Sequence, residues 1–331
     1  MNENKKTFIT INAAVLMEQE FEPLQFAVEK ILPHGLFILA GSGKIGKSWL
    51  ALDMCAAVSS GGKLWEFPAE QGEVLYLALE DNHQRLQSRL KTIEAENTDV
   101  SRLHLATASL GISNGLLEQT HNFLSEYPET KLIIVDTLER IRDTEQDKSM
   151  YSCDYRDMTA LREITNRHKL TLLLIHHTRK MYDPDPLNTL SGSTGLIGSV
   201  DGVFVLEKDK RIGNKARLTI ANRDTESYCF KVEFDPAKCK WLFMGNDMDT
   251  PDKDEPFCSL INNWLKDNWR GTATELCNEL SAVDNTFNSD PVGIKKKLTI
   301  LATFFKKELG ISVMFERTHT DKIITLTRED K

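Results

Sequence analysis

The chain has 331 residues, which is enough for about two domains at roughly 150 residues each. Hydrophobic residues make up 40% of the sequence and charged residues 27%, the proportions of an ordinary globular protein. The formal net charge of −8 argues against a protein whose whole surface binds polyanions such as nucleic acids. It is compatible with a local basic surface or with a ring whose pore alone is basic.

No apolar run approaches the ~20 residues that cross a bilayer, and the polar N-terminus is not followed by an apolar segment. These features predict a cytoplasmic protein with no membrane partner. The six cysteines are scattered and form no Cys-x-x-Cys pair, which favours reduced, buried thiols over a metal site or disulfides.

Residues 1–33 are predicted to form a polar arm with one short helix between residues 13 and 20. A short apolar strand is predicted at 35–40, because turn residues bound it on both sides. A glycine-containing loop then leads into a helix over 47–59, which carries apolar residues at helical spacing and ends before two glycines.

Strands and helices then alternate, which predicts a mostly parallel α/β sheet covered on both faces. The strands are predicted at 74–79, 103–106, 131–135 and 170–175, and the helices at 83–95, 115–126 and 152–167. Beyond residue 202 the strands follow one another closely and predict an antiparallel extension of the same sheet; they are 202–206, 216–221, 228–234 and 240–244.

The α/β part is expected to end at residue 245, because residues 246–256 are acidic, contain proline and resemble a linker. Residues 257–331 are predicted to form a small separate domain with a helix, a short strand, two helices and a two-stranded ribbon. That order outlines a winged helix-turn-helix. The long helix is predicted from residue 291 to residue 308, and the ribbon strands at 311–317 and 322–327.

Residues 41–48, Gly-Ser-Gly-Lys-Ile-Gly-Lys-Ser, match the P-loop pattern between a strand and a helix. Its glycines let backbone N–H groups converge on phosphates, and the helix that follows directs its positive end at the anion. Lys47 supplies charge for the β and γ phosphates of ATP, and the Ser48 hydroxyl reaches Mg²⁺. The expected nucleotide contacts are Gly41, Ser42, Gly43, Lys44, Ile45, Gly46, Lys47, Ser48 and Trp49.

Three further strand ends carry candidate catalytic groups. Asp136 follows four apolar residues and is expected to anchor Mg²⁺ together with Ser48. Glu80 is the candidate that polarises the attacking water, and Asp81 is expected to cap the following helix. Adjacent residues point to opposite sides of a strand, so of the pair His176-His177 we expect His177 to sense the γ phosphate and His176 to be packed.

Four segments together resemble the plasmid RepA-type hexameric replicative helicases, relatives of the DnaB and RecA ATPases that are found on mobile elements and prophages. They read AGSGKIGKSWLALDMCAAV, LALEDN, LIIVDTLERIRD and LLLIHHTRK. The resemblance covers about residues 10–245 and implies a RecA-like fold, ATP hydrolysis and a homohexameric ring with ATP between subunits. It assigns the P-loop roles to Lys47 and Ser48, the metal to Asp136, water activation to Glu80 and the sensor to His177.

Such rings also need a positive side chain donated by the neighbouring subunit. Arg223 matches this arginine finger by its place at the end of a strand, although the lysine that the family has two residues earlier is replaced by Ala221. The resemblance further implies pore loops that contact single-stranded DNA. The candidate contacts in these loops are Arg140, Arg142, Arg179 and Lys180.

The basic residues of the C-terminal domain are compatible with contact to duplex DNA or with docking of a replication protein. The candidates are Lys295, Lys296, Lys297 and Arg317. The sequence therefore favours an ATP-driven DNA helicase or translocase that serves replication of a mobile element. A nucleotide-switched DNA-binding regulator and a recombinase-like filament remain the alternatives, whereas a small-molecule kinase is disfavoured because no nucleotide-monophosphate lid is recognisable.

Overall fold

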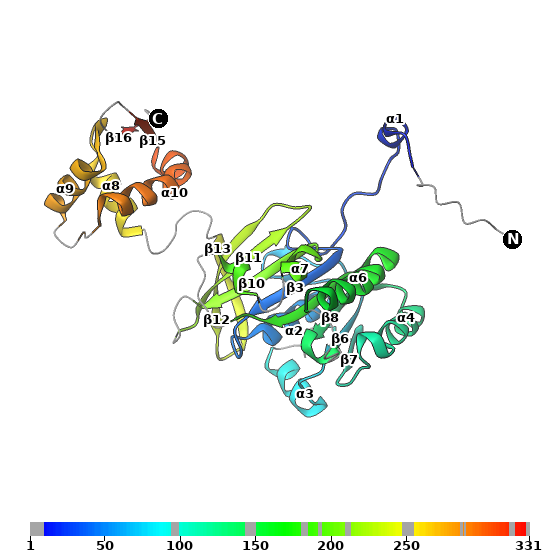
Figure 1. Ribbon diagram of the computed structural model, residues 1–331. Helices are drawn as coiled ribbons and strands as arrows, with labels where there is room; N and C mark the ends of the chain where they lie inside the picture. The colour runs from blue at the N-terminus through cyan, green and yellow to red at the C-terminus, as the bar shows by residue number, and fades with distance from the viewer. Residues whose placement is uncertain are drawn as a thin grey trace. The chain divides into compact units, whose positions relative to one another are not determined.

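The structure, a computed structural model, describes residues 10–93, 99–142, 150–179, 185–190, 194–208, 213–246, 255–284, 287, 289–317 and 322–328. The chain forms two compact units (Figure 1). The first contains most of a nine-stranded sheet and its helices. The second contains the outer parts of the last sheet strands and the C-terminal residues from Phe243 onward.

The nine strands follow the order β13-β12-β11-β10-β3-β9-β8-β6-β7 across the sheet. Every pair from β10 to β7 is parallel, as predicted. Their bounds lie close to the predicted ones: β3 (Gly35–Gly41), β6 (Glu73–Ala78), β7 (Leu103–Ala106), β8 (Thr130–Asp136), β9 (Thr171–His177), β10 (Gly202–Lys208), β11 (Lys215–Asn222), β12 (Tyr228–Asp235) and β13 (Lys240–Asn246).

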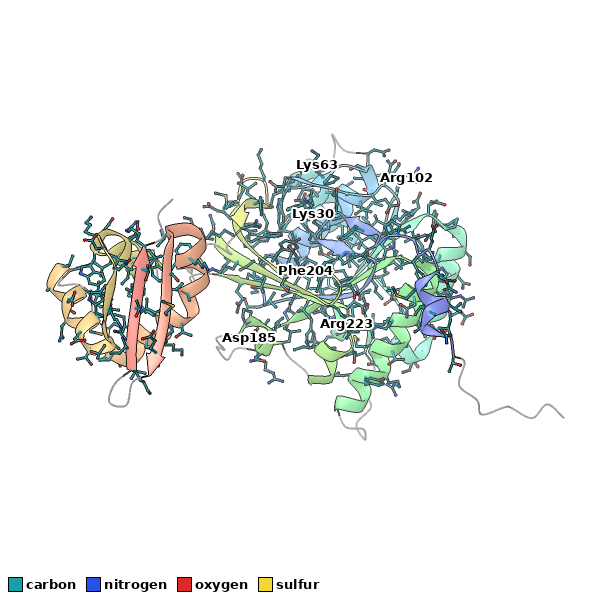
Figure 2. All side chains as sticks on the ribbon, turned by 90° about the horizontal axis from the view of Figure 1, so that it is seen from above. Lys30, Lys63, Arg102, Asp185, Phe204 and Arg223 are labelled. Atoms are coloured by element: carbon teal, nitrogen blue, oxygen red, sulfur yellow. The ribbon has the colours of Figure 1, made fainter. Side chains whose placement is uncertain are left out.

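Helices cover both faces of the parallel part of the sheet, which explains why each central strand contains a continuous apolar run of at least four residues. On one face, the core includes Leu161, Leu116 and Leu196 from three different helices. On the other face, the Phe37 and Phe204 rings meet edge to face with 6.1 Å between their centroids. Figure 2 labels Phe204 on β10. The helices of this unit are α2 (Lys47–Ser60), α3 (His83–Thr92), α4 (Leu116–Glu126), α5 (Leu138–Ile141), α6 (Met150–His168) and α7 (Thr194–Gly198).

The N-terminal prediction needs a correction. The short helix is present as α1 (Ala13–Met17), but residues 26–33 do not belong to a polar arm. They form two short paired strands, β1 (Phe26–Val28) and β2 (Leu32–Pro33), in which Val28 and Leu32 are fully buried. Strands of two or three residues are too short to show a periodic pattern, so the sequence did not reveal them. The same holds for the hairpin of β4 (Lys63–Leu64) and β5 (Phe67–Pro68).

The C-terminal residues form three helices and a three-stranded antiparallel sheet with the strand order β14-β16-β15. These helices and strands follow one another in the predicted order: α8 (Glu255–Trp264), β14 (Trp269–Thr272), α9 (Ala273–Val283), α10 (Pro291–Leu309), β15 (Ile311–Arg317) and β16 (Lys322–Arg328). Thr272 and Glu275 cap α9 reciprocally, and Asp290 caps α10. Most of the predicted linker, residues 247–254, lies outside the described residues. No helix in the described part of the chain has the length and apolar character needed to span a membrane.

Candidate nucleotide-binding site

The register of the parallel strands brings the predicted site residues to one edge of the sheet. Gly41 at the end of β3 pairs with His177 of β9, and Asp136 of β8 pairs with Ile175 of β9 and with Ala78 of β6. The P-loop therefore begins at the edge where β6, β8 and β9 end, and the catalytic candidates lie at the ends of these three strands. This edge is where open α/β sheets bind their ligands.

Two glycines of the loop are required by its shape. A β-carbon on Gly41 would lie 2.8 Å from the Leu206 carbonyl oxygen of the neighbouring strand. Gly46 has a φ of 108° and forms the N-cap of α2, a backbone conformation that favours glycine. In contrast, a β-carbon on Gly43 would meet nothing within 4 Å.

Trp241 supports the loop from β13 and was not expected from the sequence. Its indole Nε1 donates to the Gly46 carbonyl oxygen at 3.1 Å, and its side chain is almost fully buried. Trp65 in turn donates to the Trp241 carbonyl oxygen at 2.6 Å. Trp241 is 195 residues away from Gly46 in the sequence, so no local pattern could have indicated this contact.

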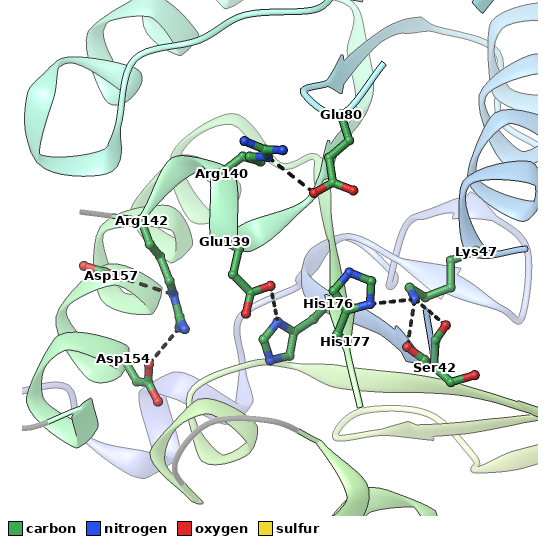
Figure 3. Close-up of polar contacts among 11 residues, drawn as sticks. Ser42, Lys47, Glu80, Glu139, Arg140, Arg142, Asp154, Asp157, His176 and His177 are labelled. Atoms are coloured by element: carbon green, nitrogen blue, oxygen red, sulfur yellow. Dashed lines mark hydrogen bonds and ion pairs between the residues drawn. The ribbon is translucent and has the colours of Figure 1, made fainter. Parts of the chain in front are cut away.

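Lys47 lies folded back over the loop. Its Nζ donates to the carbonyl oxygens of Gly41 at 2.7 Å and Ser42 at 3.0 Å, and it lies 3.3 Å from Nδ1 of His177 (Figure 3). Burial lowers the pKa of Lys47 to about 8, although the carboxylates of Asp136 and Glu80 act in the opposite direction. When a nucleotide binds, the Lys47 ammonium would exchange its hydrogen bonds to neutral carbonyl oxygens for hydrogen bonds to a charged phosphate. Hydrogen bonds between charged groups are stronger, so this exchange favours nucleotide binding.

We expect the affinity for ATP to fall as the pH rises through about 8. The pKa of Lys47 lies below the 10.5 of an ordinary lysine, so above pH 8 the empty site holds a neutral amine that must take up a proton when the nucleotide binds. The linkage predicts an affinity about tenfold weaker at pH 9 than at pH 7. Calorimetry in two buffers of different ionisation enthalpy measures the proton uptake. Equal affinity at both pH values would contradict the expectation, and Lys47→Arg, which stays charged, should abolish the pH dependence.

Asp136 is buried and holds hydroxyl groups of two other elements. Tyr76 donates to its Oδ2 at 2.8 Å, and the Ser48 side chain also bonds to the carboxylate. Burial raises the pKa of Asp136, whereas the two hydroxyl hydrogen bonds lower it. Ser48 and Asp136, predicted as metal anchors, are thus in direct contact. Tyr76 is an additional supporting residue; its phenol within an otherwise apolar strand was the only signal for it.

Glu80 lies two residues beyond β6 and is about half-exposed. Its Oε1 accepts from Nε of Arg140 at 3.3 Å (Figure 3). The expectation that Asp81 caps α3 is wrong, because the cap is Asn82, whose side chain accepts from the Arg85 N–H. Asp81 instead forms ion pairs with Arg85 and with Arg89 on the same helix.

The two histidines of β9 point in different directions, as the strand geometry requires. His177 faces Lys47, on the side predicted for the γ-phosphate sensor. His176 is 1% exposed, and its Nδ1 lies 3.7 Å from Oε2 of Glu139 (Figure 3). The prediction that His176 is packed is confirmed.

Arg223 lies at the opposite edge of the sheet. Its backbone N–H donates to the Asp201 carbonyl oxygen at 2.8 Å, immediately before β10 begins at Gly202. Because Gly202 pairs with Phe37 near the start of β3, this is the edge remote from the P-loop. The same contact shows that β11 runs antiparallel to β10, as predicted. Arg223 therefore cannot reach the nucleotide bound by its own chain.

The predicted DNA contacts have different surroundings. Arg142 needs a correction: Asp154 and Asp157 surround its mostly buried guanidinium, and the Arg142 Nη2 to Asp154 Oδ1 distance is 2.8 Å (Figure 3). These acids, brought in by α6, make it a packing residue instead of a phosphate contact. Arg140 and Arg179 are exposed. Lys180 and the side chain of Arg317 lie outside the described residues.

The three lysines of α10 are not equivalent. Lys296 is exposed. The ammonium of Lys295 lies 5.7 Å from the centre of the Phe315 ring, and that of Lys297 lies 5.3 Å from the centre of the Phe257 ring. Cation–π contacts of this kind hold the two lysines against the domain.

The family model described as "AAA domain" matches residues 7–183, which is more than half of the chain. The chain belongs to the AAA domain family. No curated protein matches its sequence. The matched residues include the P-loop, Glu80, Asp136 and both histidines of β9, whereas Trp241 and Arg223 lie beyond them.

Two solved structures resemble the fold of this AAA domain protein. One, described as an ATPase domain, has a TM-score of 0.53 at 12% identity, and the similarity covers 64% of this chain and 85% of that chain. A DnaB-like replicative helicase, described with its interactions with primase, has a TM-score of 0.52 at 14% identity. There the similarity covers 63% of this chain but only 57% of the helicase chain. The predicted RecA-like fold of a P-loop ATPase is therefore confirmed.

Proposed function

We propose that the protein is an ATP-driven DNA helicase or translocase that works as a homohexameric ring, as expected for replication of a mobile element or plasmid. The observation that carries the proposal is the division of the ATPase machinery between two opposite edges of one sheet. Lys47, Asp136, Glu80 and His177 gather at one edge, and Arg223 stands at the other. A finger that cannot serve its own nucleotide must serve the nucleotide of a neighbour.

The donor groups near the P-loop fit Mg²⁺. A carboxylate and a hydroxyl, from Asp136 and Ser48, are already in contact beside the loop, and hard oxygen ligands are those that Mg²⁺ prefers. Together with the phosphates these two residues would hold the ion. The ion would supply positive charge against the phosphate oxygens.

The roles of the remaining groups follow from their chemistry. Lys47 exchanges the carbonyl oxygens of Gly41 and Ser42 for phosphate oxygens. Glu80 is a half-exposed carboxylate that can accept a proton from the attacking water. His177, on the Lys47 side of β9, distinguishes an occupied γ position from an empty one by hydrogen bonding.

DNA contact is proposed for the segments that follow the catalytic strands. Arg140 follows β8 and Arg179 follows β9, and both are exposed. Arginines in this position suit a sequence-independent grip on the phosphates of single-stranded DNA. The structural similarity to a DnaB-like replicative helicase agrees with such a role.

A second candidate function has its own support. The helix–strand–helix–helix–strand–strand order of residues 255–328 is that of a winged helix-turn-helix, and Lys296 on its longest helix is exposed. A nucleotide-switched regulator that binds duplex DNA through this domain, or docks a replication protein there, would not unwind DNA.

Strand displacement separates the two functions. We expect the full chain with ATP to release a labelled strand from a forked duplex and its ATPase to be stimulated by single-stranded DNA, with both activities lost in Lys47→Ala. Particle size measured with ATP should correspond to closed rings. A pure protein that hydrolyses ATP and binds duplex DNA, yet never displaces a strand, would refute the motor function and favour the regulator; filaments instead of rings would favour a recombinase-like protein.

A further inference from the structure

The side chain of Arg223 shares its environment with a second arginine. Asp201, the residue before β10, accepts a hydrogen bond from Nη2 of Arg162 at 2.6 Å through its Oδ1. Nη1 of Arg223 lies 3.9 Å from the same oxygen. One carboxylate oxygen therefore faces two guanidinium groups, and Arg162 on α6 is much the closer of the two.

Asp201 is fixed in place by the start of β3. Its second oxygen, Oδ2, accepts from the Leu36 N–H at 2.9 Å. A β-carbon on Gly35 would lie 2.8 Å from this oxygen, so the carboxylate packs directly against the backbone there. The carboxylate cannot follow Arg223 outward. Any change in their distance must come from the arginine.

Arg223 is anchored at its backbone but only weakly at its tip. Apart from the Asp201 contact, its Nη2 donates to the Gly198 carbonyl oxygen at 3.2 Å. The side chain is 53% exposed, whereas that of Arg162 is 28% exposed. The guanidinium of Arg223 thus keeps N–H groups available to an outside acceptor, and that of Arg162 is committed to Asp201.

We propose that Arg162 and Asp201 are positioning residues for Arg223. This inference rests on the proposed function of Arg223 as a finger for the ATP of an adjoining copy. Arg162 neutralises the charge of Asp201 and donates a hydrogen bond to its Oδ1. The carboxylate can therefore orient Arg223 without forming a short, direct ion pair with it. A phosphate of the adjoining copy can then compete for the Arg223 guanidinium.

The charge balance gives a specific expectation. If Arg162 is lost, the Asp201 carboxylate remains and Arg223 is the arginine that can approach it. A direct, charge-assisted hydrogen bond between Arg223 and Asp201 would be much stronger than the present 3.9 Å contact. Arg223 would then be held at Asp201 and kept away from the nucleotide of the adjoining copy. If Arg162 and Asp201 are neutralised together, the attraction disappears and Arg223 is available again.

The experiment measures steady-state ATP turnover of the full chain with single-stranded DNA for Arg162→Gln, Arg162→Lys and the double variant Arg162→Gln/Asp201→Asn. Residues in direct contact commonly couple strongly enough for Arg162→Gln to lower kcat about tenfold with KM for ATP nearly unchanged. Arg162→Lys should keep most of the turnover, because it keeps the charge. The double variant should recover to within about threefold of the wild type.

Controls distinguish this inference from the proposal on which it rests. Arg167→Gln, an exposed arginine of the same helix, should leave turnover unchanged. Normal turnover in Arg223→Ala would refute the finger itself. If Arg223→Ala is impaired but Arg162→Gln is normal, or if the double variant is as slow as Arg162→Gln, positioning by Arg162 and Asp201 is refuted.

Thermal unfolding of each variant checks the fold. Should Arg162→Gln fail to fold, the comparison of Arg162→Lys with the double variant decides the question. Both should be active, and turnover at the level of Arg223→Ala in a folded Arg162→Lys protein would overturn the proposal.

Discussion

Replacing Arg223 by alanine is expected to reduce ATP turnover about 10³-fold, the lower end of the range for arginine fingers in other NTPases. The loss should appear in kcat and not in nucleotide affinity, because Arg223 lies at the sheet edge opposite to its own P-loop. Nucleotide affinity of the variant, measured by calorimetry, should therefore equal that of the wild type.

Mixing two inactive variants tests whether Arg223 acts between copies. Lys47→Ala chains lack the phosphate-binding lysine but still carry the finger, and Arg223→Ala chains have the opposite defect. In a random one-to-one mixture, about one junction in four combines an intact P-loop with an intact finger. Part of the activity should return on mixing. No recovery in oligomers shown to exchange subunits, or turnover within about twofold of the wild type in Arg223→Ala alone, would contradict the finger role.

Replacing Glu80 by glutamine is expected to lower kcat between about 10²- and 10⁴-fold, the usual contribution of a general base. The amide keeps the size and the hydrogen-bonding oxygen of the carboxylate but cannot accept the proton of the attacking water. Binding of ATP should be retained, since Glu80 contacts Arg140 and not the P-loop. Single-turnover hydrolysis, measured beside calorimetric ATP binding, separates the two effects.

Glu139 provides the matched control for Glu80. Its side chain is 53% exposed, close to the 48% of Glu80, and it also follows a strand that ends at the site. Glu139→Gln should turn over ATP at a rate near that of the wild type. If Glu139→Gln carries the large loss and Glu80→Gln does not, the water-activating role belongs to Glu139.

Local patterns were enough to predict the sheet and most of its helices. The apolar runs that end at Gly41, Asp136 and His177 are each long enough to specify a buried strand, and parallel pairing then brings their carboxyl ends to a common edge. Caps act within three residues, yet the one cap predicted was misplaced by one position: Asn82 caps α3, and Asp81 does not. Strands of two or three residues were not predicted, because they are too short to show a hydrophobic periodicity.

Contacts between distant side chains could not be predicted in this way. Arg142 looked like a surface cation of a DNA-binding loop, yet α6 brings two carboxylates against it. The hydrogen bond from Tyr76 to Asp136 spans 60 positions of the chain. In both cases the partner comes from another element, and the side-chain period of a strand or helix carries no information about which partner that is.

The sequence by itself determined that this chain has a P-loop between a strand and a helix, with acids and a histidine at the ends of neighbouring strands. These features follow from short-range rules of backbone conformation and hydrophobic period. Only the tertiary structure decided that Trp241 supports Gly46, that Arg223 stands at the far edge of the sheet, and that Arg162 shares Asp201 with it. The reason is physical: such arrangements depend on packing between segments that are remote in the chain.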